Sequence, residues 1–167
     1  MTLFEPILRA LNDAEVRYVA VGGVAVVLHG HARLTTDLDL AIDLAPEPAA
    51  AAVKALVNIG FEPRVPVDPL GIADPDVRRR WIEDKGMTVF SMWDPSDPTH
   101  AVDLFVTEPI DFEELWDRSI LVSLEHTQAR IASIPDLIRM KETSGRPLDR
   151  DDIEALTTIL GDQQEDG

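Results

Sequence analysis

The sequence lacks cysteine, and it has no apolar stretch long enough to cross a membrane. None of its 167 residues is cysteine, so disulfide bonds and thiolate metal sites are excluded, in keeping with a reducing cytoplasm. The longest apolar stretch, residues 19–28, is far shorter than the about 20 residues that a membrane span requires. The first six residues, MTLFEP, lack the basic region of a secretion signal. We therefore expect a cytoplasmic protein that does not associate with membranes.

Basic residues are also scarce. The chain has 15 Lys and Arg against 31 Asp and Glu, which gives a formal net charge of −16. Because binding to a nucleic-acid backbone requires a stripe of basic residues, we expect no binding to duplex DNA. The exception is the arginine run 78–80, which has acidic residues at i,i+4 spacing if residues from about 75 form a helix. A solvated, self-neutralised helix face is one interpretation of this run, and binding of an acceptor is the other.

Length and hydrophobic content indicate one compact domain. A chain of 167 residues with 45% hydrophobic residues can bury roughly two thirds of its unfolded surface. We expect a single domain over residues 1–161, with its core in 16–106 and C-terminal helices in 135–160. The polar residues 162–167 are expected to form a frayed tail.

Hydrophobic periodicity predicts an α/β (α+β) fold with a small mixed β-sheet flanked by helices. Helices are predicted from residue 4 to about 11, from residue 24, and over 46–59, 75–84, 111–117, 135–143 and 149–160, the last ending at Gly161. Strands are predicted over 16–21, 87–93, 99–106, 120–124 and 129–132, and for the segment 35–43. Four prolines and one glycine between residues 62 and 75 predict a long loop without regular structure.

The segment 35–43, TTDLDLAID, places two aspartates two residues apart between apolar residues. On a strand this spacing turns Asp37 and Asp39 to the same face, roughly 7 Å apart along the chain. The repulsion between their carboxylates is then on the order of 2 kcal/mol at an effective dielectric constant of about 20. A hard cation reverses this penalty, because Mg²⁺ prefers a few carboxylate oxygens together with substrate phosphates. The pair therefore predicts a site for Mg²⁺ or Mn²⁺, and solvated acids on a strand are the alternative.

A glycine pair precedes the two aspartates. Gly22 and Gly23 end the apolar run 18–21 and lie between a predicted strand and a predicted helix. Backbone without side chains at such a turn lets a phosphate approach the N–H groups and the positive end of the helix dipole. A simple tight turn is the alternative, but the order of glycine pair, spacer and paired acids favours a triphosphate site. Arg33 and Thr36, just before the acids, are further candidates for nucleotide contacts.

These motifs resemble those of the minimal nucleotidyltransferases of the DNA polymerase β superfamily. The family signature is an apolar residue, Gly, Gly or Ser, a helix-length spacer, and then Asp-x-Asp or Asp-x-Glu, which the chain matches with Gly22, Gly23, Asp37 and Asp39. The family also requires a third acid on a neighbouring strand, and Asp103 lies alone in an apolar strand. The resemblance implies a polymerase β-like core in which the three aspartates hold Mg²⁺ ions and Asp103 helps to deprotonate an acceptor hydroxyl. An aspartate at a water-facing sheet edge is the alternative for Asp103.

A second resemblance covers the C-terminal part. Residues 136–153, DLIRMKETSGRPLDRDDI, are similar to the ending of small bacterial nucleotidyltransferases related to the AbiE-type toxins. The resemblance therefore spans roughly residues 16–160. In those proteins a helix lysine reaches the nucleotide phosphates, which implies this role for Lys141, with Arg146 as the second candidate. Ordinary capping is the alternative, since a cation near a helix end before a glycine interacts favourably with the helix dipole.

The resemblance implies a metal-dependent transfer of a nucleoside monophosphate from a nucleoside triphosphate, ATP being a candidate, to a hydroxyl acceptor on protein or RNA. One form of this activity is a toxin that modifies the 3′ end of a transfer RNA within a toxin-antitoxin system. The alternative from another class is a non-catalytic, antitoxin-like binding protein that keeps the fold. Retention of all three acids argues against this alternative. A partner chain or a homodimer is compatible with either function.

Overall fold

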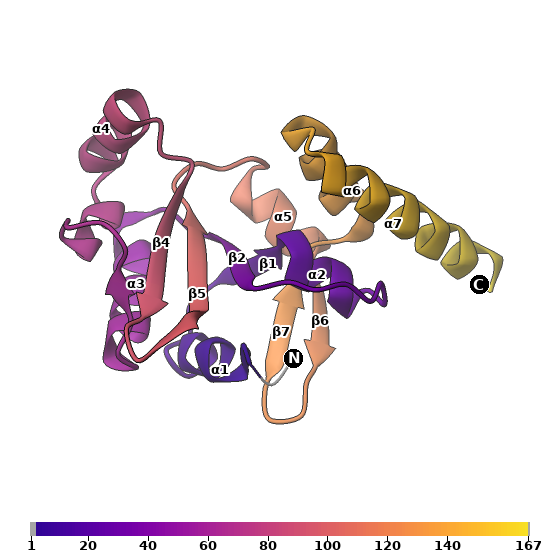
Figure 1. Ribbon diagram of the computed structural model, residues 1–167, viewed down its shortest axis with the longest axis horizontal. Helices are drawn as coiled ribbons and strands as arrows, with labels where there is room; N and C mark the ends of the chain where they lie inside the picture. The colour runs from indigo at the N-terminus through magenta and orange to yellow at the C-terminus, as the bar shows by residue number, and fades with distance from the viewer. Residues whose placement is uncertain (1–2, 167) are drawn as a thin grey trace.

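The computed structural model describes residues 3–166, which form one sheet surrounded by helices (Figure 1). In chain order the elements are α1 (Glu5–Asp13), β1 (Tyr18–Val21), α2 (Gly22–Leu28), β2 (Asp37–Ile42), α3 (Pro46–Asn58), β3 (Glu62–Pro63), the 3-10 helix η1 (Pro69–Ala73), α4 (Pro75–Lys85), β4 (Val89–Asp94), β5 (Asp97–Phe105), α5 (Phe112–Arg118), β6 (Ile120–Ser123), β7 (Gln128–Ile131), α6 (Ile134–Ser144) and α7 (Pro147–Glu165). The predicted fold class, a mixed sheet flanked by helices, is confirmed.

The sheet has the strand order β3-β4-β5-β2-β1-β7-β6. Strand β2 pairs with β5 in parallel and with β1 in antiparallel orientation, while β4 and β5 form an antiparallel hairpin. Two parallel pairs, β2 with β5 and β1 with β7, make the sheet mixed. The central position of β2 is important because its neighbours on both sides contribute to the site described below.

Alternation along β2 separates a buried face from an open one. Leu38, Leu40 and Ile42 are buried in a single hydrophobic core, whereas Asp37 is exposed and Asp39 is half-buried on the opposite face. The core also includes the apolar side of α1 and the alanine-rich side of α3. The small alanine side chains let α3 pack closely in the core. Because successive residues of a strand point to opposite faces, burial of the apolar residues of β2 places the aspartates on the other face.

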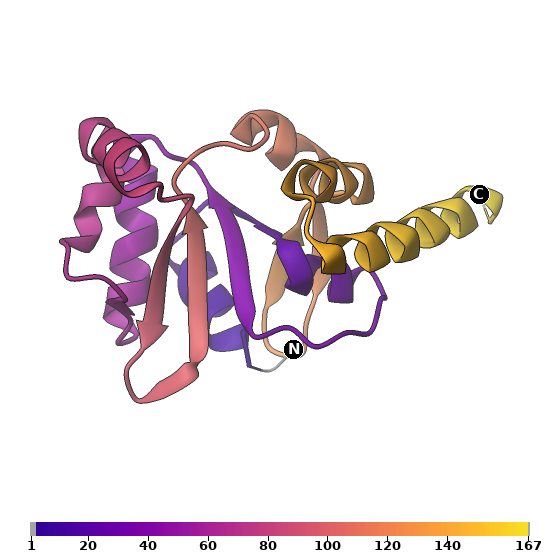
Figure 2. The ribbon, with the colours of Figure 1, turned by 45° about the horizontal axis from the view of Figure 1, so that its top comes forward.

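The helices divide between the two ends of the sheet. Figure 1 shows α3 and α4 at the β3 end and α6 with α7 at the β6 end, and Figure 2 shows that α7 extends away from the body of the molecule. Helix α6 begins at the N-cap Ser133, whose side chain accepts a hydrogen bond from the Asp136 N–H, and ends at Gly145, where φ is 65°. This glycine turns the chain into α7, so that α6 and α7 pack against each other.

Three segments differ from the sequence-based prediction. Residues 62–75, predicted as a structureless loop, contain β3 and η1, because proline at the first positions of a helix costs no hydrogen bond. Helix α7 does not end at Gly161 but continues to Glu165, so the predicted frayed tail is helical as far as Glu165. Its last residue, Gly167, lies outside the described residues. In α4 the ion pair that forms is Arg79 with Asp76 at i,i+3, at 2.6 Å, in place of the predicted i,i+4 pairs.

Candidate active site

Strand register brings Asp39 of β2 next to Asp103 of β5. The two residues are direct partners in the parallel pair, and Asp37 is the partner of Ala101. Neighbouring strands lie about 4.8 Å apart and register partners share a face, so Asp39 and Asp103 project side by side from the open face of the sheet. The structure thus brings the three predicted acids onto one surface.

The Asp39 carboxyl is held in an unfavourable environment for negative charge. Burial, followed by repulsion from Asp103 and Asp37, raises its pKa to about 7, and this rise is opposed by the positive charges of Arg146 and Lys141. A carboxyl group that stays partly protonated near neutral pH is poised to accept a cation in place of the proton. The two basic residues that the sequence singled out are therefore within electrostatic reach of Asp39.

Gly22 lies directly against the Asp39 carboxylate. It has φ of 64°, and a Cβ added to it would lie 2.1 Å from Asp39 Oδ2. Both the left-handed backbone and this contact exclude any larger residue. Helix α2 begins at Gly22, so the glycine turn, the helix start and the Asp39 side chain meet at one point. The contact with the Asp39 carboxylate is a requirement for glycine at this position that the sequence motif did not predict.

Gly23 packs against the loop that precedes β2. A Cβ at this position would lie 2.7 Å from both Arg33 Nη2 and Thr35 Oγ1. Arg33 is therefore close to the glycine turn, and its guanidinium forms an ion pair with Asp152 of α7. Thr36, the predicted neighbour of the nucleotide, is exposed, while the Thr35 side chain faces the turn. Sequence reasoning did not select Thr35.

Lys141 lies in a buried ion-pair network between α6 and α7. Its Nζ atom is 2.7 Å from Asp152 Oδ2 and 3.3 Å from Asp149 Oδ1. Asp152 is 1% exposed, and it also accepts from Arg33. Burial raises the pKa of Asp152, but the hydrogen bonds from Lys141 and Arg33 outweigh burial and leave the pKa below its usual value. The network joins the C-terminal helices to the loop before β2.

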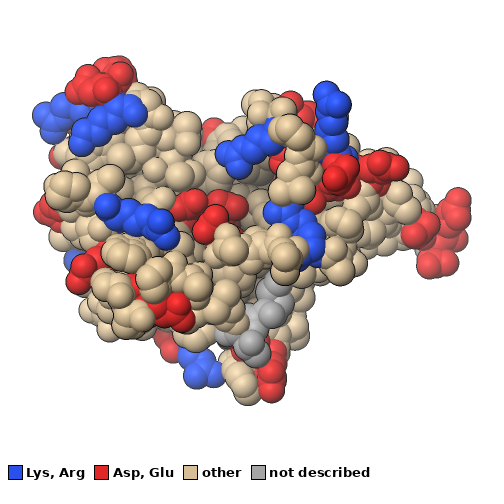
Figure 3. Space-filling view, in the orientation of Figure 1, with Lys and Arg blue, Asp and Glu red and all other residues tan. Residues whose placement is uncertain are grey.

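Acidic and basic side chains gather around the hollow middle of one face of the molecule. Figure 3 shows acidic side chains in this hollow, between the part that carries α4 and the part that carries α6 and α7, with basic side chains on either side. Arg146 is the N-cap of α7, and its N–H donates to Asp149. The positive charges around the acids have the sign that a bound polyphosphate requires.

The carboxylates can be tested for their fit to a divalent cation. Within residues 3–166, no three His, Asp or Glu side chains are gathered tightly enough to form a ready-made metal site. The donor chemistry nevertheless fits Mg²⁺, because Asp39 faces two further carboxylates and has a raised pKa, and hard oxygen ligands with excess negative charge suit this ion. Asp37, Asp39 and Asp103 are the residues that would hold it.

Ser91 is a site residue that sequence reasoning missed. It is the register partner of Asp103 across β4 and β5, and its Oγ donates a 2.5 Å hydrogen bond to Asp103 Oδ1. This bond holds one carboxylate oxygen toward β4 and leaves the other for a metal ion or a proton. The signal in the sequence was a hydroxyl residue with apolar neighbours on both sides within the predicted strand 87–93.

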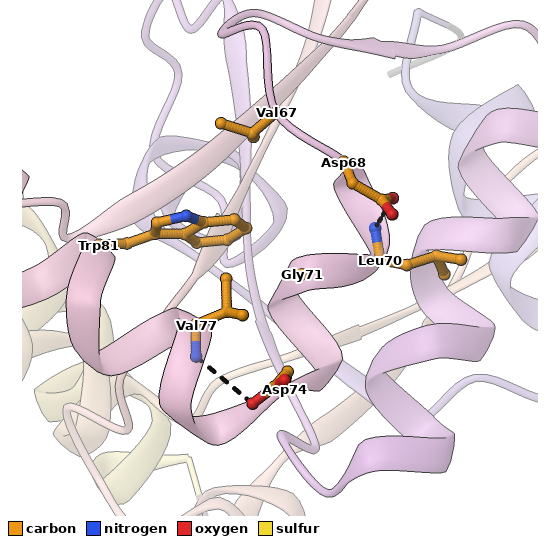
Figure 4. Close-up of a pocket in the computed structure, with 7 residues that line it drawn as sticks. All are labelled: Val67, Asp68, Leu70, Gly71, Asp74, Val77 and Trp81. Carbon is orange, nitrogen blue, oxygen red and sulfur yellow. Dashed lines mark hydrogen bonds between the residues drawn. The ribbon is translucent and has the colours of Figure 1, made fainter.

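A separate pocket lies between η1 and α4 and has a volume of about 330 Å³. Figure 4 shows the Trp81 indole and Val77 on one side and the carboxylates of Asp68 and Asp74 near its edge. Both carboxylates cap helix starts, since Asp68 accepts from Leu70 N–H and Asp74 from Asp76 and Val77 N–H. None of the lining residues belongs to the carboxylate cluster of β2 and β5.

Among the described residues, no helix combines the length and the apolar character of a membrane span. No protein-family model and no curated protein sequence matches the chain. The similarity that exists is in the fold. Solved structures of similar fold have sequences that are at most 16% identical to this chain.

The lincosamide antibiotic adenylyltransferase LnuA, solved with lincomycin bound, superposes with a TM-score of 0.64 at 16% identity, covering 95% of this chain and 96% of that one. The antibiotic-resistance factor ANT(2″)-Ia superposes with a TM-score of 0.62 at 15% identity over 97% of this chain and 84% of that one. A nucleotidyltransferase-like protein from Paracoccidioides brasiliensis gives a TM-score of 0.59 at 16% identity, covering 96% and 74%. The chain therefore has the fold of a minimal nucleotidyltransferase.

Proposed function

We propose that the protein is a metal-dependent nucleotidyltransferase whose active site is the carboxylate cluster of β2 and β5. The observation that carries this proposal is the register pairing of Asp39 with Asp103 beside the Gly22 turn. A cluster of three acids on an open sheet face is costly without a cation, and the pKa of Asp39 is raised first by burial and then by repulsion from Asp103 and Asp37. The fold shared with nucleotidyltransferases supports the same conclusion.

In the proposed reaction each residue has a distinct task. Asp37, Asp39 and Asp103 would hold Mg²⁺ or Mn²⁺, which neutralises charge on the triphosphate. The Gly22-Gly23 turn would bind phosphate through backbone N–H groups, assisted by Arg33, Thr36, Lys141 and Arg146. Asp103 would take the proton from the acceptor hydroxyl. The acceptor oxygen forms a bond to the α-phosphorus, the bond from that phosphorus to the bridging oxygen breaks, and pyrophosphate leaves.

The acceptor class separates two forms of this activity. A hydroxyl on protein or at an RNA end corresponds to a toxin-like enzyme. The structural neighbours favour a second form, in which the acceptor is the hydroxyl of a small molecule. LnuA is solved with lincomycin bound, and ANT(2″)-Ia is solved in complex with adenylyl-2″-tobramycin. The net charge of −16 disfavours a long polyanion as acceptor, and a nucleic acid would be engaged only at its end.

The first test removes the metal ligands. In the double variant Asp37→Ala with Asp39→Ala, we expect the Mg²⁺-dependent part of ATP binding to be lost, while the melting temperature stays equal or rises because a repulsive pair is gone. Calorimetric titration and a melting curve measure both quantities. Asp43→Ala is the matched control, since Asp43 also lies near β2 but pairs with Arg17. Unchanged ATP affinity in the double variant would contradict the metal assignment.

A labelled nucleotide identifies the acceptor, because the label is transferred to it. Incubation of the protein with each α-labelled nucleoside triphosphate in a cell extract, and separation into protein, RNA and small molecules, shows where the label goes. The variant Asp103→Asn serves as the control for the chemical step. An amide cannot take the proton and is a poorer metal ligand, so labelling should fall at least about 100-fold while ATP binding persists. Labelling at the parental rate would make Asp103 a structural residue only.

A further inference from the structure

The open sheet face continues beyond Asp103 toward the strand edge. Asp39, Asp103 and Ser91 are successive register partners on β2, β5 and β4. Directly after β3, the Arg64 N–H donates a 3.0 Å hydrogen bond to the Ser91 carbonyl, which extends the same row to Arg64. Because antiparallel partners share a face, Arg64 projects on the side of the sheet that carries the carboxylates. Two strand spacings, about 10 Å, separate Asp103 from Arg64.

The Arg64 side chain covers Trp93 on that face. Its guanidinium carbon lies 5.5 Å from the centre of the indole ring, and Trp93 is the register partner of Ala101, which in turn pairs with Asp37. Ala101 contributes only a methyl group and is 3% exposed, so other side chains cover it. The half-buried Trp93 and the exposed Arg64 lie at the β4 end of these paired strands.

Arg64 has no acidic partner within residues 3–166. None of the ion pairs and side-chain hydrogen bonds of the described chain involves its guanidinium, and none joins it to Glu62 of the adjacent β3. Arg64 therefore carries a positive charge that no ion pair among the described residues compensates, about 10 Å from Asp103. The planar guanidinium fork, oriented by stacking on the indole, suits an oxyanion such as a phosphate.

The two sides of the carboxylate cluster have different surroundings. Gly22, Gly23, Arg33 and the α6–α7 helices lie on the β1 side, where the proposed function places the triphosphate. Arg64 and Trp93 lie on the β4 side, which leaves this side for the acceptor. Figure 3 shows basic side chains immediately beside the acidic group in the hollow.

We propose that Arg64 and Trp93 form the acceptor subsite, and that the acceptor is a hydroxyl compound that carries a phosphate group. The hydroxyl would lie at Asp103, the phosphate would accept from the Arg64 guanidinium, and the part that joins them would lie against the edge of the Trp93 indole, since Arg64 covers a face of that ring. This inference rests on the proposed function, which it extends by naming the chemical class of the acceptor. A polycationic acceptor, in contrast, would meet the positive charge of Arg64.

The experiment uses the full chain, ¹⁵N-labelled, with Mg²⁺ and a non-hydrolysable ATP analogue. The sequence contains three tryptophans, and the variant Trp93→Phe assigns the indole N–H signal of Trp93. Ribose 5-phosphate and ribose are titrated at equal ionic strength. We expect ribose 5-phosphate to shift the Trp93 signal with an affinity at least about tenfold higher than that of ribose, because charge-assisted hydrogen bonds are among the strongest polar contacts.

Variants decide whether Arg64 is responsible. Arg64→Ala should abolish the preference for the phosphorylated sugar, Arg64→Lys should keep part of it, and Lys54→Ala, an exposed cation on α3, should keep all of it. No response of Trp93, an equal response to both sugars, or a preference that survives Arg64→Ala would overturn the inference. Failure of the ATP analogue to shift the Gly22 and Gly23 amide signals would instead count against the proposed function, while a phosphate response at Trp93 would still stand.

Discussion

The carboxylates on β2 and β5 and those on α7 are placed in opposite electrostatic environments. Asp39 lies against two further acids and its pKa is raised to about 7 by burial and by their repulsion. Asp149 and Asp152 are also buried, but hydrogen bonds to Lys141 and other donors lower their pKa values in spite of burial. Within residues 3–166 no ion pair involves the first group, whereas the second group shares Lys141.

This difference separates a binding site from a structural support. An acid whose charge is uncompensated has a use for a ligand, whereas an acid paired within the protein fixes the elements that carry its partners. Asp152 joins α7 to Lys141 of α6 and to Arg33 of the loop before β2. The network therefore holds the basic residues at a fixed place beside the carboxylate cluster, and Lys141 has a structural task whether or not it also contacts phosphate.

We expect the largest effect when the ion pairs of Asp149 and Asp152 with Lys141 are removed. Lys141→Ala leaves two buried carboxylates without their shared cation, so we expect the free energy of unfolding to fall by about 3 kcal/mol or more. Lys85→Ala is the matched control, because Lys85 also lies in the last turn of a helix before a left-handed glycine, but is exposed. Its loss should cost less than about 1 kcal/mol. Urea denaturation measures both, and equal losses would return Lys141 to simple capping.

The same variants test contact with the nucleotide. At a temperature where Lys141→Ala is folded, its affinity for ATP should fall by a larger factor than its affinity for AMP, since an ammonium near the terminal phosphates meets more charge. Adding Asp152→Asn should restore part of the stability but none of the ATP affinity. Equal factors for ATP and AMP would limit Lys141 to the structural role.

The second prediction concerns Gly22. Gly22→Ala places a Cβ where Asp39 Oδ2 now lies, so the carboxylate must move, and we expect Mg²⁺-dependent ATP affinity to fall about 100-fold, which corresponds to about 3 kcal/mol. Gly86→Ala is the control, because Gly86 has φ of 61° but nothing within 4 Å of an added Cβ. It should cost only the left-handed backbone penalty of about 1 to 2 kcal/mol and leave ATP affinity unchanged. Calorimetric titration of both variants gives the comparison.

The elements with clear local signals could be predicted from the sequence. Alternation of Leu38 and Leu40 with the acids predicts which face of β2 is buried, and a glycine pair between strand and helix predicts the turn at Gly22. The predicted stop at the end of α7 failed because the local signal was too weak. Gly161 was expected to end α7, but an exposed glycine inside a helix costs only about 1 kcal/mol, and the helix continues to Glu165.

Contacts between distant segments could not be predicted. Ser91 meets Asp103 because β4 and β5 pair in one particular register, and a shift of one residue would turn the serine to the other face. Arg33 meets Asp152 across 119 residues of sequence, and no local pattern indicates that pairing. The resemblance indicated Lys141 and Arg146 as phosphate ligands, but not the two aspartates that neutralise Lys141.

The smallest expected effect is a pH dependence that distinguishes the two groups of acids. Because the pKa of Asp39 is raised to about 7, the folded protein holds its proton more tightly than the unfolded chain does. Stability from this group is therefore present at low pH and is lost as pH rises from about 4 toward 7. Asp149 and Asp152, with lowered pKa values, act in the opposite direction, since their contribution is present above about pH 4 and is lost on further acidification.

We therefore expect the metal-free protein to lose about 1 to 2 kcal/mol of stability between pH 5 and pH 8, a value reduced because solvent partly screens a half-buried carboxyl. Asp39→Asn should flatten this part of the profile, because an amide does not titrate, and Mg²⁺ should reduce the loss by binding the ionised form. Asp152→Asn should lower stability by a constant amount across this range, leaving its slope unchanged, and should alter the slope only below about pH 4. Urea denaturation at a series of pH values gives the profile. A decline that persists in Asp39→Asn would show that another group causes it, and the contrast between the two sets of acids would then fail at its central residue.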